Sequence, residues 1–491
     1  MIMKCLTTPI FYANDKPHLG HLYSVLIADI WKKGAVLFDL PALFVSGMDE
    51  HGQKVAISAK KQGYSPQEHV NKISAQFLDF FYNYDVVPEK WVRTTSAEHK
   101  EAVTHFWKLL KEKDYIYKGK YSGWYSISEE AYLLDASKNE YVHTQDVNIV
   151  WREEECYYFK LSLFEDKLKE FYKNNVEFIY PKVRYNEVCG FLNQGLKDFV
   201  ISRPKSRLNW GIVVPDDDEH VIYVWFDALI NYLSAIGYPN ERYKKNWPAI
   251  HILGKDILKF HAIYWIAMLM AAEIDPPKKM LVHGWWMAEN RKISKSLNNA
   301  VDLKDLSYKY QTDGIRYFLV HGIPLGNDGE FKEESIRSLV YSDLANKYGN
   351  LFLRILGMIE QFFNNEIHDY GYTDQILVKE LDNIIENLKI FYDDPIQIEK
   401  YIGAFMQAVL AVDAYIYEKR VWQMEKKEVE GVLYFLLDIF RKISILAYPI
   451  LPGTTTKILK FLNMKPLLKF YNLKLPQILS EARPILFPKN S

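Results

Sequence analysis

KCLTTPIFYANDKPHLGHLYSVLIADI, residues 4–30, is the stretch that decides the fold. Residues 4–10 have the pattern of a buried strand, and the polar loop after them contains Pro17. From His18 onward, apolar residues recur at spacings of three and four, which is the period of an α-helix: Leu19, Leu22, Leu26 and Ile30. The stretch therefore predicts a strand, a loop and a helix.

The same alternation recurs farther along the chain. Strand-like runs at 43–46 and 250–254 are each followed by a helical pattern, the second running from about Asp256 to Ala272. This order predicts an α/β fold, a Rossmann-like doubly wound parallel sheet. An aromatic-rich insertion splits it, and after residue 335 the pattern is almost purely helical. We expect five parts: 1–114 and 211–290 as the two halves of the domain with the parallel sheet, 115–210 as the insertion, 291–340 as a loop region, and 341–491 as a helical domain.

Composition excludes several classes of protein. Of 491 residues, 49 % are hydrophobic and 25 % are charged, as in ordinary globular proteins. No apolar run approaches the ~20 residues that a membrane span needs, and the N-terminus lacks the pattern of a secretory signal. The 3 cysteines are widely spaced, which fits a reducing compartment. We expect a soluble cytoplasmic protein that does not bind a membrane.

The charge is unevenly distributed. The net charge of −1 by itself discourages a nucleic-acid partner. Residues 441–491, however, carry nine bases against one acid, a local balance of +8. Such a stretch could attract a phosphate backbone, or it could be a solvated basic tail.

Two short motifs have the chemistry of phosphate binding. His18-Leu19-Gly20-His21 opens the predicted helix, where unpaired N–H groups favour anions and the histidines can donate to phosphate. Lys292-Ile293-Ser294-Lys295-Ser296, 274 residues later, suits a loop that closes over a polyphosphate. Each motif taken alone could be a surface helix start or a solvated loop. Their occurrence as a pair on the two halves of an interrupted α/β fold favours the functional interpretation.

This pair resembles the HIGH and KMSKS signatures of class I aminoacyl-tRNA synthetases. The surrounding sequence resembles the methionyl-tRNA synthetase family in particular, in the same order and at similar spacing along the catalytic part. The matching segments are TTPIFYANDKPHLGHLYS (7–24), SGMDEHGQKV (46–55), GWYSISEEAY (123–132), LNWGIVVPDD (208–217), YVWFDALINYLSAIGYP (223–239), ILGKDILKFHAIYWIAML (252–269) and LVHGWWMAENRKISKSLNN (281–299).

The resemblance implies activation of L-methionine with ATP, followed by transfer of methionine to the terminal ribose of tRNA(Met), initiator or elongator. It implies catalytic roles for His18, His21, Lys292 and Lys295, with Lys295 stabilising the leaving pyrophosphate. It also places Gly20, Asp256 and Ser294 among the ATP-binding residues. Asp256 could also be a helix N-cap, either instead of this role or together with it. Mg²⁺ is expected with ATP and pyrophosphate.

For methionine, the resemblance implies that Asp49 anchors the ammonium group. The rest of the implied pocket is apolar or aromatic: Ile10, Tyr12, Trp225, Ala228, Leu229, Tyr232, Phe260 and His261. Aromatic edges against a thioether contribute about 0.3–1.5 kcal/mol per contact, and His261 and Tyr232 could donate to sulfur. On periodicity alone, the aromatic residues could equally be core.

The insertion departs from the pattern of relatives that carry CxxC zinc knuckles. Residues 115–155 contain no cysteine. We expect a zinc-free form, with no protein metal site, in which an aromatic cluster replaces the knuckle: Tyr121, Trp124, Tyr125 and Tyr132.

In the helical domain, the resemblance implies an anticodon reader formed by Asn346, Asn350, Arg354 and Trp422. The first three are four and eight residues apart and would share a helical face. They could instead be surface residues, with Trp422 in the core. The chain ends soon after this domain, so we expect a monomer.

Two other functions stay open on the residues alone. One is a nucleotidyltransferase that acts on a small acid without RNA, against which the helical domain argues. The other is a catalytically silent tRNA-binding paralogue, against which the intact His18, His21, Lys292 and Lys295 argue.

Overall fold

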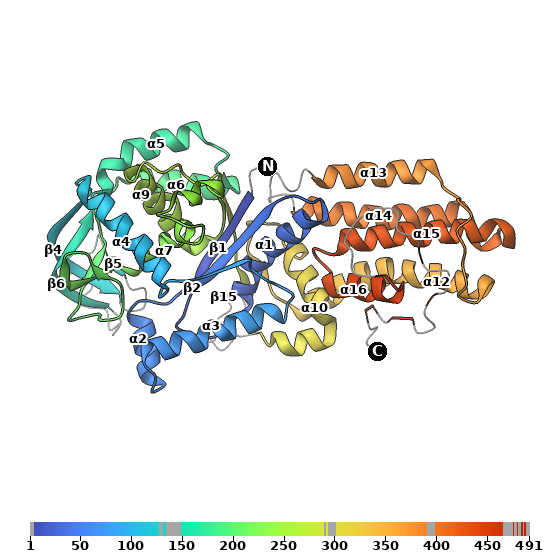
Figure 1. Ribbon diagram of the computed structural model, residues 1–491, viewed down its shortest axis with the longest axis horizontal. Coiled ribbons are helices and arrows are strands. Elements are labelled where there is room, and N and C mark those ends of the chain that lie inside the picture. Colours follow the sequence, from blue (N-terminus) through green and yellow to red (C-terminus); the bar gives the residue numbers. More distant parts are fainter. Residues whose placement is uncertain are drawn as a thin grey trace. The chain divides into compact units, whose positions relative to one another are not determined.

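The computed structural model divides into two compact units (Figure 1). Unit 1 comprises residues 1–17, 43–80 and 88–283, and unit 2 comprises 18–42, 81–87 and 284–491. Within them the structure describes residues 4–126, 131–133, 149–288, 291–292, 301–389, 398–464, 475, 479, 483–484 and 486–487.

A six-stranded sheet organises unit 1, in the order β3-β2-β1-β12-β13-β7. The pairings β1–β12, β12–β13, β13–β7 and β2–β3 are all parallel, which confirms the predicted sheet. Strand order reverses between β1 and β12, so their carboxyl ends form the switch point at which ligands of such sheets bind. The strands are β1 (Lys4–Tyr12), β2 (Ala42–Asp49), β3 (Lys90–Arg93), β7 (Ile179–Tyr180), β12 (Ile250–Gly254) and β13 (Lys279–His283).

Helices of unit 1 follow their strands. In α4, Ser96 caps the first turn by accepting a 3.2 Å hydrogen bond from the His99 backbone N–H, and apolar residues at helical spacing are buried. The α-helices are α2 (Gln53–Lys61), α3 (Pro66–Tyr82), α4 (Ala97–Glu112), α5 (Glu165–Asn174), α6 (Lys182–Asn193), α7 (Val224–Leu229) and α8 (Asn231–Ser234).

The helix predicted from Asp256 is not a uniform α-helix. A 3-10 turn, η3 (Lys255–Ile257), leads into a π-helical segment, η4 (Phe260–Trp265), and then into α9 (Ile266–Ala271). Wider turns of this kind change which side chains share a face, so the α-helical period alone misplaces them.

The predicted insertion, 115–210, forms antiparallel structure within unit 1 only in part. It also contains α5, α6 and β7, and β7 belongs to the six-stranded parallel sheet, so the expected limits are wrong there. Strands β4 (Ile116–Ser126) and β6 (Ile149–Phe159) pair over their whole length, from Ile116↔Phe159 to Ser126↔Ile149. They belong to a sheet of order β5-β4-β6-β8, and a smaller sheet has the order β10-β11-β9. The remaining strands are β5 (Ala131–Leu133), β8 (Phe199–Val200), β9 (Ser202–Pro204), β10 (Val213–Val214) and β11 (Asp217–Ile222).

Part of the aromatic cluster expected in this insertion is visible. The hydroxyl of Tyr121 donates a 2.9 Å hydrogen bond to the Trp124 carbonyl, and Trp124 meets the Trp151 ring edge-on at 5.4 Å. The backbone pairs Tyr125 with Tyr132, but their side chains lie outside the described residues. So do residues 127–130 and 134–148, and the zinc-free form stays a prediction.

Unit 2 is almost entirely helical after residue 332 in its described part, as predicted. A three-stranded sheet of order β15-β14-β16 precedes most of these helices. The elements are α1 (Leu19–Leu37), β14 (Trp286–Ala288), β15 (Arg291–Lys292), α10 (Leu303–His321), β16 (Gly329–Glu330), α11 (Glu333–Leu339), the π-helix η6 (Val340–Gly349), α12 (Asn350–Phe363), α13 (Gln375–Lys389), α14 (Ile398–Glu418), η9 (Val421–Gln423), α15 (Lys426–Ala447) and α16 (Pro452–Phe461). Within the described residues, no helix is both long and apolar enough to cross a bilayer.

A buried ion pair ties α1 to α10 inside unit 2. The Arg316 guanidinium donates to the Asp29 carboxylate at 2.8 Å, and both side chains are almost fully buried. Arg316 also donates to the carbonyls of Tyr84, Pro449 and Ile450 at 2.7, 2.6 and 3.0 Å. One side chain thus satisfies four acceptors from separate segments, which an apolar residue cannot do.

Arg316→Met is expected to lower the free energy of unfolding of unit 2 by about 3–5 kcal/mol, because only Lys33 would then pair with the buried Asp29 carboxylate and three backbone carbonyls would lose their donor. Urea unfolding followed by circular dichroism measures this loss. Lys309→Met on the same helix is the matched control, since Lys309 makes exposed ion pairs with Asp305 and Glu333. It should cost at most about 1 kcal/mol. Equal losses for the two variants would contradict the central role of Arg316.

Candidate active site

The candidate methionine residues of strands β1 and β2 lie at or near their carboxyl ends. Ile10 and Tyr12 are on β1, and Asp49 is the last residue of β2. The backbone N–H of Ala13 donates to the Asp49 carbonyl at 2.8 Å, so the two strand ends are joined beyond the sheet. Lys54 lies over the Tyr12 ring at 5.7 Å. A carboxylate at this position can bind a ligand ammonium group at the switch point.

The turn that carries Asp49 is fixed by its next two residues. Glu50 is buried, and its carboxylate accepts a 2.6 Å hydrogen bond from the Arg93 side chain. Trp210 donates through its indole N–H to the Glu50 carbonyl at 2.6 Å. The rings of Trp210 and His51 meet edge-on at 5.5 Å. These contacts hold the backbone directly after the candidate anchor.

The aromatic residues predicted for the pocket lie together, although they come from separate segments. The rings of Trp225 on α7 and Phe260 on η4 stack at 3.8 Å, with only 4° between their planes. His261 meets Trp225 edge-on at 6.3 Å. Ala228 and Leu229 continue α7 and are both buried. The structure therefore brings these residues into one cluster within unit 1.

Tyr232 and His261 form a hydrogen-bonded pair whose protons have defined partners. His261 Nδ1 lies 2.9 Å from the Ile257 carbonyl, which can only accept, so this nitrogen carries the ring proton. His261 Nε2 then accepts from the Tyr232 hydroxyl at 2.8 Å. Burial lowers the pKa of His261 to about 4, so the ring is neutral at pH 7. Donation from either residue to a methionine sulfur requires one of these bonds to break, and it stays a prediction.

A second buried histidine, His251, was not among the predicted site residues. Strand pairing places it opposite Thr7, and its Nδ1 lies 2.7 Å from the Thr7 hydroxyl. Its Nε2 accepts from the Trp265 indole N–H at 3.2 Å, and the Tyr232 ring lies 4.1 Å away. Burial lowers its pKa well below the ordinary value, so it too is neutral. A polar residue inside a fully buried strand is the signal that could have identified it.

A third group that the sequence analysis missed centres on Asp227 of α7. Its two carboxylate oxygens bind His51 Nδ1 at 2.6 Å and His99 Nε2 at 2.7 Å, and all three side chains are buried. The other nitrogen of His99 contacts the Ser234 hydroxyl at 2.8 Å. Burial alone would raise the pKa of Asp227, but the charge and hydrogen bonds of the two histidines hold it at about 2. Asp227 thereby connects the turn after Asp49 to the helix that carries Trp225.

Asp256 lies at the carboxyl end of β12, as predicted. A Cβ at Gly254 would lie 2.6 Å from the Asp256 carboxylate, so a larger residue there would require the Asp256 side chain to shift. The N-cap of η3 is Gly254, and Asp256 lies in the first turn. The alternative of Asp256 as a helix N-cap is therefore wrong for η3. A carboxylate next to the switch point can accept from ribose hydroxyls.

The HLGH motif opens α1 in unit 2 with a reciprocal cap. His18 Nδ1 accepts from the Gly20 backbone N–H at 3.1 Å, and His21 Nδ1 accepts from the His18 backbone N–H at 3.2 Å. The two rings stack at 3.7 Å. A neutral imidazole that accepts through Nδ1 carries its proton on Nε2. Both histidines are thus set as Nε2–H donors at a helix N-terminus, which suits phosphate oxygens.

The second motif is only partly described. Lys292 belongs to β15, whose backbone pairs it with Met287 on β14. Nothing is described of its side chain, and Ser294 and Lys295 lie outside the described residues. Their assigned roles stay predictions.

The candidate anticodon residues are accessible in unit 2. Asn346 on η6 and Asn350 at the start of α12 are exposed, and Arg354 is partly exposed and paired with Asp413 on α14. Trp422 is 44 % exposed, and its ring lies 6.0 Å from that of Tyr417, so the alternative of a core tryptophan is wrong. The shared face was predicted for an α-helix, whereas η6 is a π-helix.

Three basic residues in the described part of the stretch 441–491 are paired with carboxylates. Arg441 is fully buried and bound to Asp438, which also pairs with Lys442. Arg483 pairs with Glu360. Lys460 is exposed on α16.

The neutrality of His261 predicts a pH dependence of stability. Unfolded, its imidazole has the ordinary pKa of 6.5 and binds a proton below it, whereas the folded ring resists protonation down to about 4. Stability is therefore lost as pH falls from about 6.5 to 4. Urea unfolding gives the free energy of unfolding at pH 7 and at pH 4. Between these two pH values it should decrease by about 2–3 kcal/mol more in the native chain than in His261→Gln. His105→Gln, at an exposed histidine, should behave as the native chain. Parallel pH profiles for the native chain and His261→Gln would contradict this.

Comparison with known proteins identifies the family. The family model described as "tRNA synthetases class I (M)" matches residues 4–146 and 137–356. The chain is 38 % identical to a methionine–tRNA ligase of Rickettsia typhi, over 99 % of both chains. It is also 38 % identical to a mitochondrial methionine–tRNA ligase of Xenopus laevis, over 93 % of this chain and 85 % of the relative.

A solved structure gives the same result. The Mycobacterium tuberculosis methionyl-tRNA synthetase in complex with methionyl-adenylate matches with a TM-score of 0.89 and 32 % identity, over 100 % of both chains. The likeness to this structure therefore covers the fold as well as the sequence. The chain therefore belongs to the methionyl-tRNA synthetase family of class I tRNA synthetases.

Proposed function

We propose that the chain is a methionine–tRNA ligase that forms methionyl-adenylate from L-methionine and ATP and then charges tRNA(Met). The observation that carries this proposal is the likeness, over the whole of both chains, to a family member solved with methionyl-adenylate. In the first step a methionine carboxylate oxygen attacks the α-phosphorus, and the bond to the β-phosphate breaks to release pyrophosphate. In the second, a 3′-terminal ribose hydroxyl attacks the methionyl carbonyl, its proton is lost, and AMP leaves.

In this proposal Asp49 binds the methionine ammonium group, and the thioether lies among the clustered side chains. The stacked pair of Trp225 and Phe260 supports this assignment, because aromatic surface binds a polarizable sulfur well. The neutral pair of Tyr232 and His261 supports it further, since no charge there needs solvation. The remaining contacts are Ile10, Tyr12, Ala228 and Leu229. One methylene is worth only about 1–3 kcal/mol, so homocysteine is the hardest competitor to reject.

For ATP, we propose that His18 and His21 donate to its phosphates at the start of α1 and that Gly20 admits the nucleotide to the backbone. The reciprocal cap supports this, since it occupies Nδ1 of both rings and so places the proton of each neutral ring on Nε2. Asp256 accepts from the ribose. Lys292, Ser294 and Lys295 bind the polyphosphate, Lys295 chiefly as charge builds on the leaving pyrophosphate. Mg²⁺ enters with ATP as part of the substrate.

For tRNA, we propose that Asn346, Asn350, Arg354 and Trp422 contact the anticodon of both initiator and elongator tRNA(Met). Exposed amides, a guanidinium and an indole are the groups that read unpaired bases. We also propose that the chain acts as a cytoplasmic monomer with a zinc-free insertion, and that residues 341–491 are its anticodon-binding part.

The proposed activity is tested by ATP–pyrophosphate exchange with each of the twenty amino acids in the absence of tRNA. We expect exchange with methionine alone. Exchange with another amino acid would overturn the proposed pocket, and no exchange would favour a catalytically silent tRNA-binding protein. Asp49→Asn should raise the KM for methionine about 10–100-fold through loss of a charged hydrogen bond. Asp218→Asn, at an exposed carboxylate of the same unit, is the matched control and should leave it unchanged.

The anticodon assignment predicts that Trp422→Ala lowers kcat/KM for charging of tRNA(Met) about 10–100-fold, because stacking contributes about 1–3 kcal/mol per base. Methionine-dependent exchange should be unchanged, because it needs no tRNA. Tyr308→Ala removes another exposed aromatic ring of unit 2, 89 % exposed on α10, and serves as the control. Unchanged charging by Trp422→Ala would remove Trp422 from the anticodon site.

A further inference from the structure

A chain of hydrogen-bonded side chains in unit 1 joins the segments that carry the candidate methionine residues. This chain, the Asp227 network, consists of His51, Asp227, His99 and Ser234. His51 follows Asp49 by two positions, and Asp227 follows Trp225 by two. Ser234 likewise follows Tyr232 by two. The network therefore connects the turn of the candidate ammonium anchor to both helices that supply the aromatic side of the pocket.

Asp227 is the centre of the network. It accepts hydrogen bonds from His51 Nδ1 at 2.6 Å and from His99 Nε2 at 2.7 Å, and all three side chains are buried. Burial opposes ionisation, but the two histidines hold the pKa of Asp227 at about 2, so both bonds are charge-assisted at pH 7. Because each of its oxygens is bound to a histidine, Asp227 acts on a ligand through the segments that it holds.

The far end of the network reaches α8. His99 Nδ1 lies 2.8 Å from the Ser234 hydroxyl, which lies 3.3 Å from the Asn231 carbonyl. His99 belongs to α4, which carries none of the candidate pocket residues. This helix therefore gives α7 and α8 a support that lies outside the pocket.

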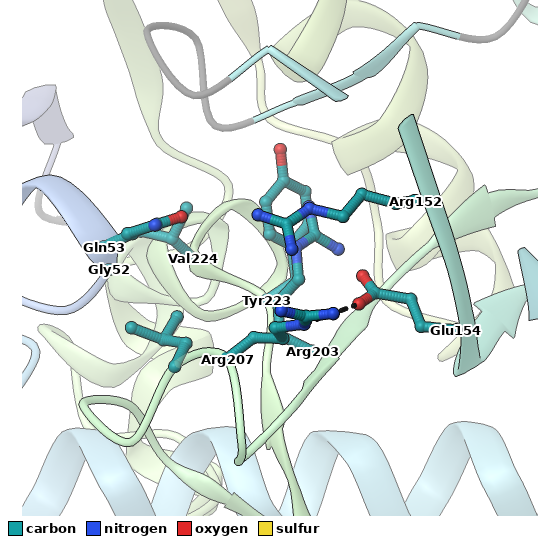
Figure 2. A pocket seen from close by; sticks show the side chains of 9 residues that line it. Gly52, Gln53, Arg152, Glu154, Arg203, Arg207, Tyr223 and Val224 are labelled. Atoms are coloured by element: carbon teal, nitrogen blue, oxygen red, sulfur yellow. Dashed lines mark ion pairs between the residues drawn. The ribbon is translucent and has the colours of Figure 1, made fainter. Parts of the chain in front are cut away.

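Open space borders the two segments that Asp227 joins. Gly52, which follows His51, and Val224, which precedes Trp225, both line a partly open pocket of about 400 Å³ (Figure 2). In a close-packed region, interdigitated side chains would fix the spacing of the two segments. Beside an open pocket fewer contacts do so, and the hydrogen bonds of Asp227 carry more of the constraint.

A pocket that binds both ends of a ligand selects the length of that ligand. In the proposed function, Asp49 binds the ammonium group and the aromatic side with Trp225 binds the thioether. The spacing between these two sides decides whether a side chain one methylene longer fits. Such a difference changes kcat/KM by about 10–200-fold in an apolar pocket, provided that the walls do not yield.

We propose that Asp227 is a positioning residue that fixes the spacing between the Asp49 turn and helices α7 and α8, and that it thereby selects the length of the amino acid. The proposal rests on the proposed ligase function. The preferred ligand is an α-amino acid with an unbranched thioether side chain of the length of methionine. L-Ethionine, which is one methylene longer, is the competitor that this spacing rejects.

The main test is Asp227→Asn in the full chain. Asparagine keeps the volume but replaces one acceptor oxygen by an NH2 donor, so one histidine loses its bond. In ATP–pyrophosphate exchange, the KM for L-methionine should rise about tenfold, with kcat within about threefold of the native value. The ratio of kcat/KM for methionine to that for ethionine should fall about tenfold. A loss of folded protein lowers both rates in proportion and leaves this ratio unchanged.

A milder variant tests the network at its other end, where Ser234 is only partly buried. Ser234→Ala removes one neutral hydrogen bond and should lower the methionine-to-ethionine ratio about threefold. Ser234→Thr keeps the hydroxyl and should retain the native ratio. This pair tests the proposal even where Asp227→Asn does not fold.

Asp217→Asn is the matched control. Asp217 is a carboxylate of the same unit outside the network, and it accepts from the Tyr157 hydroxyl at 2.9 Å and contacts His220 Nδ1 at 3.0 Å. This variant should leave the ratio unchanged, and an equal fall in it would overturn the proposal. So would native ratios in both Asp227→Asn and Ser234→Ala. A native chain without methionine-dependent exchange would overturn the ligase function itself, whereas native exchange with unchanged ratios in the variants overturns only the role of Asp227.

Discussion

The parallel pairing of β1 with β12 is the interaction on which the rest of unit 1 depends. It joins residues 244 positions apart, with Thr7 opposite His251 and bonded to it. Because the strand order reverses at this pair, the carboxyl ends of the two strands form the switch point at which ligands of such sheets bind. Tyr12, Asp49 and Asp256 all lie at or just beyond strand ends along this edge. Without this pairing, the candidate methionine and ribose groups would have no common location.

Near this switch point, the surroundings of each buried titratable side chain decide whether it is charged. Two histidines, His251 and His261, are kept neutral by burial. Asp227, just as deeply buried, stays ionised because two imidazoles bind its two oxygens. Desolvation and hydrogen bonding thus give opposite results at neighbouring positions. The outcome is an uncharged aromatic surface next to a turn held by a charged network, which suits a ligand that has an apolar end and an ammonium group.

The arginines fall into two groups, those that make structural contacts and those that line a pocket. Arg316 and Arg441 make structural contacts inside unit 2, and both are fully buried. Arg152, Arg203 and Arg207 instead line an open pocket. The net charge of −1 conceals this division, because it sums groups that a ligand can reach with groups that it cannot. Even within this pocket the arginines differ, because Arg207 is 60 % exposed whereas Arg203 is only 5 % exposed.

The sequence alone determined the alternation of strands and helices, the helix start at His18 and the helical region after residue 335, which follow from local periodicity and short motifs. The aromatic residues of the candidate pocket were implied by the family resemblance, since on periodicity alone they could equally be core. Tertiary structure decided which buried polar groups meet: Asp227 is 176 residues from His51 and 128 from His99. It also decided the protonated nitrogen of His261 and the π-helical path of residues 260–265. Hydrophobic periodicity cannot predict these features, because each depends on a partner that only folding brings within hydrogen-bonding distance.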